Sequence, residues 1–370
     1  MLSLFITETA RREQSRHKFF NTIYKECKKR MIDFRIVAFM ESAEEPLLSG
    51  VDIMVPIDSI GKSFLKRGGL MKFWNTLSKY NPDHLLIGGY GYLECWLALI
   101  YAKKKGIPVT FWSGAGQDTT INDTLVHNAL KKTFLKNIDN AITYGKNATK
   151  FHRKLGVNPS SIYQCVNVSD VDFFRTVLDQ HMDSREFIQN TDNKKKPILI
   201  FAGRLEKEKG VHLLIEQLIR LPLDSYFCYF LGSGSLENYI ERRIKKNQIN
   251  GTLCGYLSQD QVAKKFVESD IYILPSLNDP FSRTLSEALA SGCFCLNSKY
   301  DDASYDLIKE GHNGYIFDPK NFDEFRYHMK KLTRKDWNRP DRREISKSYN
   351  FNMVDYSQKV VEAVSELLSD

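Results

Sequence analysis

Two basic residues, Arg204 and Lys209, follow a short apolar run at residues 198–202 and precede a segment of helical periodicity. The apolar run predicts a buried strand, and parallel α/β sheets bind ligands beyond the carboxyl ends of their strands. Guanidinium and ammonium groups form charge-assisted hydrogen bonds with phosphate oxygens, worth roughly 1.5–3 kcal/mol each. This position favours a diphosphate site, although the same residues would also make an ordinary solvated charged turn.

A second anion-binding feature is predicted near residues 275–292. Ser282 is the expected N-cap of a helix over residues 283–290, so the first N–H groups and the positive end of the helix dipole would favour phosphate. Asp279 precedes this helix, and Glu287 lies five residues inside it, roughly 7 Å further along the axis. One carboxylate would accept hydrogen bonds from a sugar and the other from a ribose. The turn Gly232-Ser-Gly234 would bring backbone close to a ligand, but such a turn is weak support by itself.

Short apolar runs alternate with helix-period segments along the whole chain, which predicts an α/β fold with parallel sheets and crossover helices. Strands are expected at residues 2–7, 34–39, 84–87, 108–112, 141–144, 198–202, 226–231, 271–275 and 293–296. Ser258 and Gln261 have capping-box spacing. The polar segment 191–197, which ends in proline, reads as a linker, and 370 residues suit two domains.

Residues 167–318 of this chain resemble the donor-binding domain of GT-B glycosyltransferases. The resemblance is to the retaining glycosyltransferase family four (glycosyl transferases group 1) in particular. The matching segments are Phe201-Ala-Gly-Arg204, Lys209-Gly210, Leu231-Gly-Ser-Gly234, Pro275-Ser276, Asp279-Pro-Phe281, Glu287-Ala-Leu-Ala-Ser-Gly292, Asn167 with Asp170 and Phe174, and Gly311-His-Asn-Gly314-Tyr315. The resemblance implies two Rossmann-like domains facing across a cleft. Residues 1–190 would bind the acceptor, residues 191–345 the donor, and residues 346–370 would form a helix crossing back to the first domain.

The resemblance also implies residue roles. Arg204, Lys209 and Asp279 would be catalytic, the two cations on the donor diphosphate and Asp279 facing the transferred sugar. The other donor-binding residues would be Gly232 and Gly234 in the glycine turn, and Tyr256 and Leu257 near the base. The backbone of Phe281, Ser282 and Arg283 would lie along the phosphates, and Glu287 would bind the ribose. Asp279 stands where the family has glutamate, and Ser282 where it often has glycine.

The first domain departs more from the family. Where many relatives carry a histidine, this chain has Trp112-Ser-Gly-Ala-Gly116. His17 and His127 are candidates for the catalytic histidine. The alternative is that each is an ordinary surface or partly buried histidine.

The expected reaction is retaining transfer from a nucleotide-diphosphate sugar to a glycan or lipid-linked acceptor, in polysaccharide or glycoconjugate synthesis. No cofactor and no metal are expected. Asp170-Val-Asp172 has a D-x-D spacing that binds metal in the other glycosyltransferase fold, but here it is assigned to the linker entry. Cys293 and Cys295 are interpreted as buried strand thiols.

Two other function classes are compatible with parts of the sequence. One is a catalytically silent GT-B partner subunit of another transferase, favoured only by Asp279 in place of glutamate. The other is a nucleic-acid-binding or DNA-modifying protein, which rests on the net charge of +8; no nucleic-acid motif accompanies it, so nucleic acid is not expected as a partner.

Seven cysteines without a C-x-x-C pair, no signal peptide and no long apolar run favour a cytoplasmic protein. The basic stretch at residues 11–30 leaves two alternatives open. It would rest on an anionic membrane as a peripheral helix, or it would be a solvated helix whose aromatic residues Phe19 and Phe20 pack on the sheet.

Overall fold

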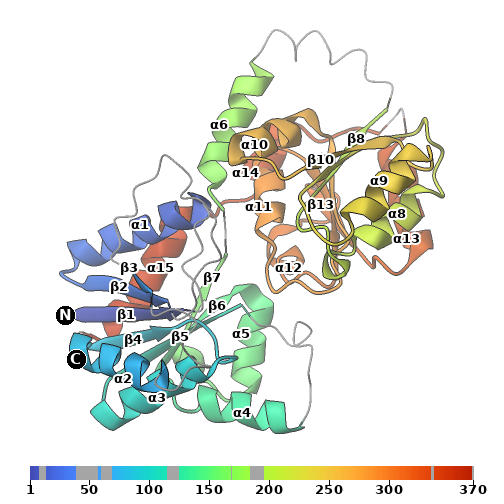
Figure 1. Ribbon diagram of the computed structural model, residues 1–370. Coiled ribbons are helices and arrows are strands. Elements are labelled where there is room, and N and C mark those ends of the chain that lie inside the picture. Colours follow the sequence, from blue (N-terminus) through green and yellow to red (C-terminus); the bar gives the residue numbers. More distant parts are fainter. Residues whose placement is uncertain are drawn as a thin grey trace. The chain divides into compact units, whose positions relative to one another are not determined.

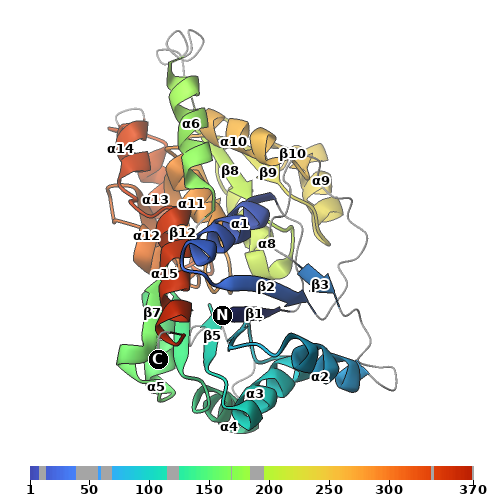
Figure 2. The same cartoon turned by 90° about the vertical axis from the view of Figure 1, so that its left-hand side faces the viewer.

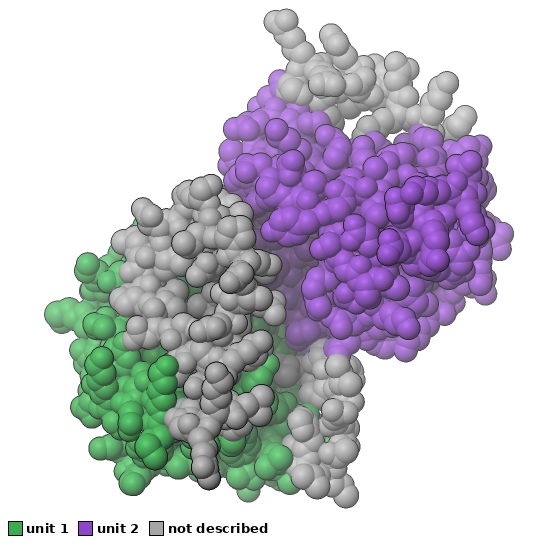
Figure 3. Space-filling model, in the orientation of Figure 1, with its two compact units in different colours: residues 1–166, 353–370 green, residues 167–352 purple. Residues whose placement is uncertain are grey.

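The computed structural model describes residues 1–7, 14–38, 57–59, 69–114, 125–167, 169–183, 196–334 and 337–368. The chain divides into two compact units, unit 1 with residues 1–166 and 353–370, and unit 2 with residues 167–352 (Figure 3). From the sequence, the domain boundaries were expected at 190/191 and 345/346 instead. The first differs because helix α6 (Val171–Met182) packs on helices of unit 2. Most of the predicted linker at 191–197 lies outside the described residues.

Unit 1 is a parallel seven-stranded sheet with the order β3-β2-β1-β4-β5-β6-β7 (Figure 1). Its elements are β1 (Leu2–Thr7), α1 (Gln14–Lys29), β2 (Asp33–Ala38), β3 (Ile57–Ser59), α2 (Gly69–Tyr80), β4 (His84–Ile87), α3 (Leu93–Lys105), β5 (Val109–Ser113), α4 (Leu125–Leu135), β6 (Asn140–Tyr144), α5 (Gly145–Lys154), a 3-10 turn (Pro159–Ser161), β7 (Ile162–Cys165) and α15 (Met353–Glu366). The predicted strands at 2–7 and 84–87 are confirmed at their bounds, whereas β3 and β7 were not predicted.

The C-terminal helix α15 completes the core of unit 1 and packs on α1 (Figure 2). The ring of Tyr356 stacks on Phe19 with centroids 4.6 Å apart, and Trp112 Nε1 donates to Tyr356 Oη at 3.1 Å. Phe19 and Ile23 are buried, one helical turn apart. The apolar side of α1 therefore packs inside unit 1. This agrees with the second alternative given for the basic stretch, a solvated helix whose aromatic residues are packed.

Unit 2 is a parallel six-stranded sheet with the order β10-β9-β8-β11-β12-β13. After α6 its elements are β8 (Ile198–Ala202), a 3-10 turn (Lys207–Lys209), α8 (Val211–Leu218), β9 (Phe227–Leu231), α9 (Glu237–Lys245), β10 (Gly251–Gly255), α10 (Gln259–Glu268), β11 (Ile271–Leu274), α11 (Arg283–Ala290), β12 (Phe294–Ser298), α12 (Ser304–Leu307), β13 (Gly314–Phe317), α13 (Phe322–Leu332) and α14 (Arg342–Lys347). The predicted α/β class with parallel sheets is confirmed.

The strand order of unit 2 defines where its loops diverge. From β8 the chain proceeds outward through β9 and β10, and it then returns to β11 on the other side of β8. Loops after β8 and β11 therefore leave the sheet in different directions, and such a topological switch point is the usual ligand crevice of an open α/β sheet. The predicted residues Arg204, Lys209, Asp279 and Ser282 all follow these two strands.

Candidate functional site

The loops after β8 and β11 are held together by backbone contacts. Gly210 has a φ of +68°, and a Cβ atom there would lie 1.8 Å from the carbonyl oxygen of Pro275. The N–H of Leu277 donates to the carbonyl of Glu208 at 2.8 Å, and Ser276 Oγ donates to the same carbonyl at 3.2 Å. Only glycine fits at residue 210, because the two loops touch there at a left-handed position.

The predicted glycine turn after β9 packs on the loop after β8. A Cβ atom at Gly232 would lie 2.0 Å from the carbonyl oxygen of Gly203, and one at Gly234 would lie 2.7 Å from that of Leu205. Glu206 accepts hydrogen bonds from Ser235 Oγ at 2.6 Å and from its N–H at 2.8 Å, which hold the pKa of the Glu206 carboxyl below its usual value. These glycines thus permit close packing of one loop on another.

The two predicted cations have different partners. Lys209 Nζ forms an ion pair with Asp279 Oδ2, and their side chains are only 19% and 6% exposed. Arg204 has a 65% exposed side chain and pairs with Glu208 across one turn. The structure therefore brings Lys209 and Asp279 together, whereas Arg204 is turned to another carboxylate. To bind a diphosphate, Lys209 and Arg204 would have to leave these carboxylate partners.

Helix α11 begins where the sequence predicted, but its N-cap works differently. Ser282 is the N-cap residue, yet its side chain accepts no hydrogen bond from the first turn. Ser282 Oγ donates instead to Asp301, as does the Ser282 N–H at 3.1 Å. Burial and, second, the charge of Asp279 raise the pKa of the Asp301 carboxyl to about 7.

Sequence reasoning missed Asp301. It follows the end of β12 by three residues, and a polar residue after a strand is the same signal that pointed to Arg204.

The remaining predicted donor residues lie around the same strand ends. Tyr256 follows β10 and is 76% exposed, with Leu257 partly exposed beside it. Phe281 is buried before α11, while Arg283 and Glu287 are partly exposed on the helix.

The two pairs of residues with possible metal-binding spacing, Asp170 with Asp172 and Cys293 with Cys295, lie at different secondary-structure elements. Asp170 is the N-cap of α6, and Asp172 Oδ1 accepts a hydrogen bond from Arg175 at 3.3 Å. Cys293 and Cys295 are buried, and burial raises the pKa of the Cys295 thiol. Among the described residues, no three His, Cys, Asp or Glu side chains gather as a metal site requires. Metal independence stays a prediction.

Few of the residues predicted to act in the acceptor unit are described. Trp112, Ser113 and Gly114 are described, but the rest of that segment and the side chains of His17 and His127 lie outside the described residues. His84 and His152 are buried in unit 1, and burial lowers the pKa of both, for His84 to about 3. Both are therefore neutral core residues.

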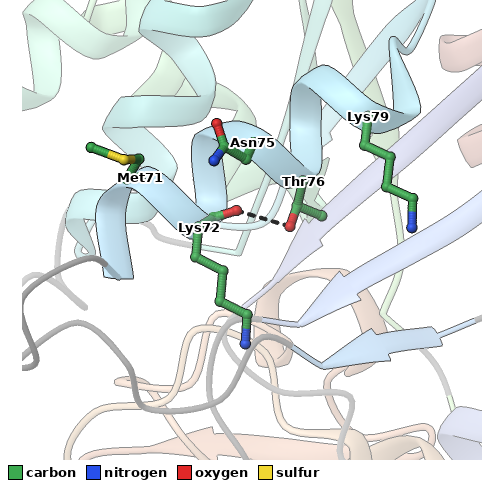
Figure 4. A pocket seen from close by; sticks show the side chains of 5 residues that line it. All are labelled: Met71, Lys72, Asn75, Thr76 and Lys79. Atoms are coloured by element: carbon green, nitrogen blue, oxygen red, sulfur yellow. Dashed lines mark hydrogen bonds between the residues drawn. The ribbon is translucent and has the colours of Figure 1, made fainter.

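A surface pocket lies on helix α2 and is lined by Met71, Lys72, Asn75, Thr76 and Lys79 (Figure 4). Thr76 Oγ1 donates to the backbone carbonyl of Lys72 at 2.9 Å, so it is bound within the helix. None of these residues was predicted to act in a site, and all belong to unit 1, whereas the predicted donor residues belong to unit 2.

The family model "Glycosyl transferases group 1" matches residues 183–350 of the chain. An uncharacterized glycosyltransferase of Methanocaldococcus jannaschii is 25% identical over 48% of this chain and 45% of its own length. The GtfA subunit of a UDP-N-acetylglucosamine–peptide N-acetylglucosaminyltransferase from Streptococcus pneumoniae is 24% identical over 63% of this chain and 50% of that protein. The chain thus spans about half the length of these curated relatives.

Solved structures match over almost the entire chain. Anabaena HepE, in complex with UDP and glucose, has a TM-score of 0.74 at 15% identity and covers 99% of this chain and 100% of its own. Sucrose-phosphate synthase from Thermosynechococcus elongatus has a TM-score of 0.77 at 13% identity, with coverage of 100% and 99%. These likenesses show the fold. The chain therefore has the two-unit GT-B fold, and its residues 183–350 match the family model of the glycosyl transferases group 1.

Proposed function

We propose that the protein transfers a sugar from a nucleotide-diphosphate sugar to a glycan or lipid-linked acceptor, with retention of configuration. The observation that carries the proposal is the group formed by Lys209, Asp279 and the start of α11 at the switch point of unit 2. An ammonium beside a helix N-terminus is suited to a diphosphate. The HepE structures that share the fold contain UDP or UDP-glucose, which supports a nucleotide-sugar donor.

In this proposal the residues divide the work of the transfer. Lys209 and the first turn of α11 stabilise the negative charge that grows on the departing diphosphate. Arg204, which is largely exposed, leaves Glu208 and adds a second cation. Asp279 faces the sugar and Glu287 binds the ribose. A leaving phosphate oxygen accepts the proton of the attacking hydroxyl, so the reaction needs neither a side-chain base nor a metal ion.

Donor binding is tested by thermal denaturation with UDP, GDP and ADP. One of them is expected to stabilise the protein, by about 2.7 kcal/mol at one hundred times its Kd, because only the folded state has the site. Stabilisation by none of the three would contradict the proposal.

Transfer is then measured with the matching nucleotide sugar, and it is expected to persist in EDTA and to give a product of retained configuration by NMR. Binding without turnover on a panel of glycan and lipid-linked acceptors would favour the silent-partner alternative instead. Loss in EDTA with recovery in Mn²⁺ would overturn the metal-free assignment.

We further propose that the acceptor unit associates with anionic membranes through charge alone. Unit 1 holds 25 of the 53 Lys and Arg residues and 18 of the 45 Asp and Glu residues, so it carries +7 of the net +8. On α1 the residues Lys25, Lys28 and Lys29 are exposed, while its apolar side is buried. None of the described helices combines the length and apolar character needed to cross a membrane.

Sedimentation with vesicles tests this association. The protein is expected to bind anionic vesicles at low salt and to be released by high salt, because each lysine near the surface contributes about 1 kcal/mol that salt screens. Replacing Lys25, Lys28 and Lys29 by glutamine should weaken this binding, with neutral vesicles as the control. Equal binding to neutral and anionic vesicles, or none to either, would remove the idea.

A further inference from the structure

The carboxyl group of Asp301 is fully buried beside the start of α11. Its Oδ1 accepts hydrogen bonds from the N–H groups of Ser282 at 3.1 Å and Ala303 at 3.0 Å. Its Oδ2 accepts from Asn297 Nδ2 at 2.8 Å and from Ser282 Oγ. Four donors, contributed by three segments of unit 2, hold this carboxylate in one place, and Ser282 is held with it.

This arrangement changes what the start of α11 offers to a ligand. A serine N-cap ordinarily accepts a hydrogen bond from the N–H of the second or third helical residue. The hydroxyl of Ser282 is turned to Asp301 and does not cap the helix. The first turn of α11 therefore keeps N–H groups for an acceptor other than Ser282, and an anion at the helix end is such an acceptor.

Asp301 also lies against Asp279. The N–H of Asp279 donates to the carbonyl of Tyr300 at 3.0 Å, and the N–H of Asp302 donates to the carbonyl of Asp279 at 3.1 Å. The two carboxylates thus come from backbone segments that are hydrogen-bonded to each other. The cation that pairs with Asp279 in the described structure is Lys209. Asp279 and Asp301 are thus neighbouring carboxylates that interact electrostatically, and Lys209 pairs with the first of them.

Two other titratable groups beside the pair, Tyr272 and Asp302, cannot carry positive charge. Tyr272 on β11 is buried, and burial first, then Asp301 and Asp279, raise the pKa of its hydroxyl, so it stays neutral. Asp302 is also buried next to Asp301. The surroundings can nevertheless hold a protonated Asp301. Asn297 Oδ1 is buried and has no hydrogen-bond partner among the described residues, so rotation of that amide would present an acceptor to the new O–H.

We propose that Asp301 is a positioning residue of the donor site, which holds Ser282 at the start of α11 and takes up a proton when a nucleotide diphosphate draws Lys209 away from Asp279. This inference rests on the proposed function. The diphosphate brings negative charge to the pair while it removes the ammonium, and both changes favour protonation of a carboxylate. The pair thereby releases Lys209 without leaving two buried like charges side by side.

The consequence is a pH dependence of donor binding with a defined sign. The pKa of Asp301 is about 7. At a pH below this value Asp301 already carries its proton in the free protein, so donor binding needs no proton uptake. At higher pH the proton must be taken up on binding, so the donor Kd is expected to rise, by up to about tenfold per pH unit.

The probe is UDP-glucose or GDP-mannose, whichever stabilises the wild-type chain, because their diphosphates do not titrate near neutral pH. Its Kd is measured by calorimetry from pH 5.5 to 8.5, in buffers of different ionisation enthalpy that report proton uptake.

Two variants separate positioning from a merely structural role. Asp301→Asn is expected to bind the donor with a Kd that no longer follows pH above 7 and without proton uptake. Ser282→Ala removes a hydrogen bond that lowers the Asp301 pKa, so it should move the midpoint of the wild-type pH profile upward. If Asp301→Asn does not fold, Ser282→Ala decides. Glu268→Gln on α10 is the control, since it removes one negative charge from a partly exposed pair with Lys265.

A wild-type Kd that is constant from pH 6 to 8.5, or the same pH profile in wild type and both variants, would overturn the inference and leave the proposed function intact. Absence of donor binding at every pH would instead contradict the proposed function itself.

Discussion

Lys209→Ala is expected to lower kcat by about 100- to 1000-fold, which is typical for the loss of one group that stabilises transition-state charge. The donor KM should rise by much less, because the ammonium interacts more strongly with the departing diphosphate than with the intact donor. The structure adds a second effect. Asp279, with a 6% exposed side chain, loses its ion pair, so the variant should also lose stability, on the order of 1–3 kcal/mol.

Steady-state kinetics with a defined donor, at a temperature well below the variant's Tm, separate the two effects. Lys207→Ala is the matched control, because it removes an exposed lysine from the same 3-10 turn and is expected to keep the wild-type rate. Lys209→Arg should recover part of the rate, since it keeps the positive charge. Transfer by Lys209→Ala at the wild-type rate would show that Lys209 does not stabilise the leaving group.

Gly210→Ala is expected to destabilise unit 2 by about 2–5 kcal/mol and to abolish donor binding. A left-handed φ costs a non-glycine residue about 1–2 kcal/mol, and overpacking adds about 1–3 kcal/mol. The added Cβ would meet the backbone of Pro275 at 1.8 Å, so the loop that leads to Asp279 and Ser282 would have to move.

Gly255→Ala isolates the cost of the backbone conformation. Gly255 has a φ of +69°, and a Cβ atom there would have nothing within 4 Å, so only about 1–2 kcal/mol should be lost. The two variants are compared by urea denaturation, followed by hydrogen exchange in β8, which reports on unit 2. Equal loss in both variants would show that contact with Pro275 contributes nothing.

Patterns among near neighbours in the chain are enough to predict the class of fold and the strand and helix ends that carry the candidate site. Residues 198–202 form a strand at the predicted bounds. A short apolar run followed by polar residues is typical of a buried strand. The helix over 283–290 also begins and ends as predicted, and Ser258 with Gln261 makes the capping box. These features depend on near neighbours in the chain. The same reasoning placed Arg204, Lys209 and Asp279 after strands, and hence at one edge of a parallel sheet.

Which side chains contact one another depends on how distant segments pack, and the sequence patterns do not predict it. The switch point between β8 and β11 follows from strand order, which apolar runs do not encode. Lys209 pairs with Asp279, 70 residues away, while Arg204 pairs within its own turn. Ser282 donates to Asp301 instead of capping its helix, because β12 brings a buried acceptor to within hydrogen-bonding distance. Each of these choices depends on loops brought together by sheet pairing, and a buried carboxylate takes the donors that the packed fold places around it.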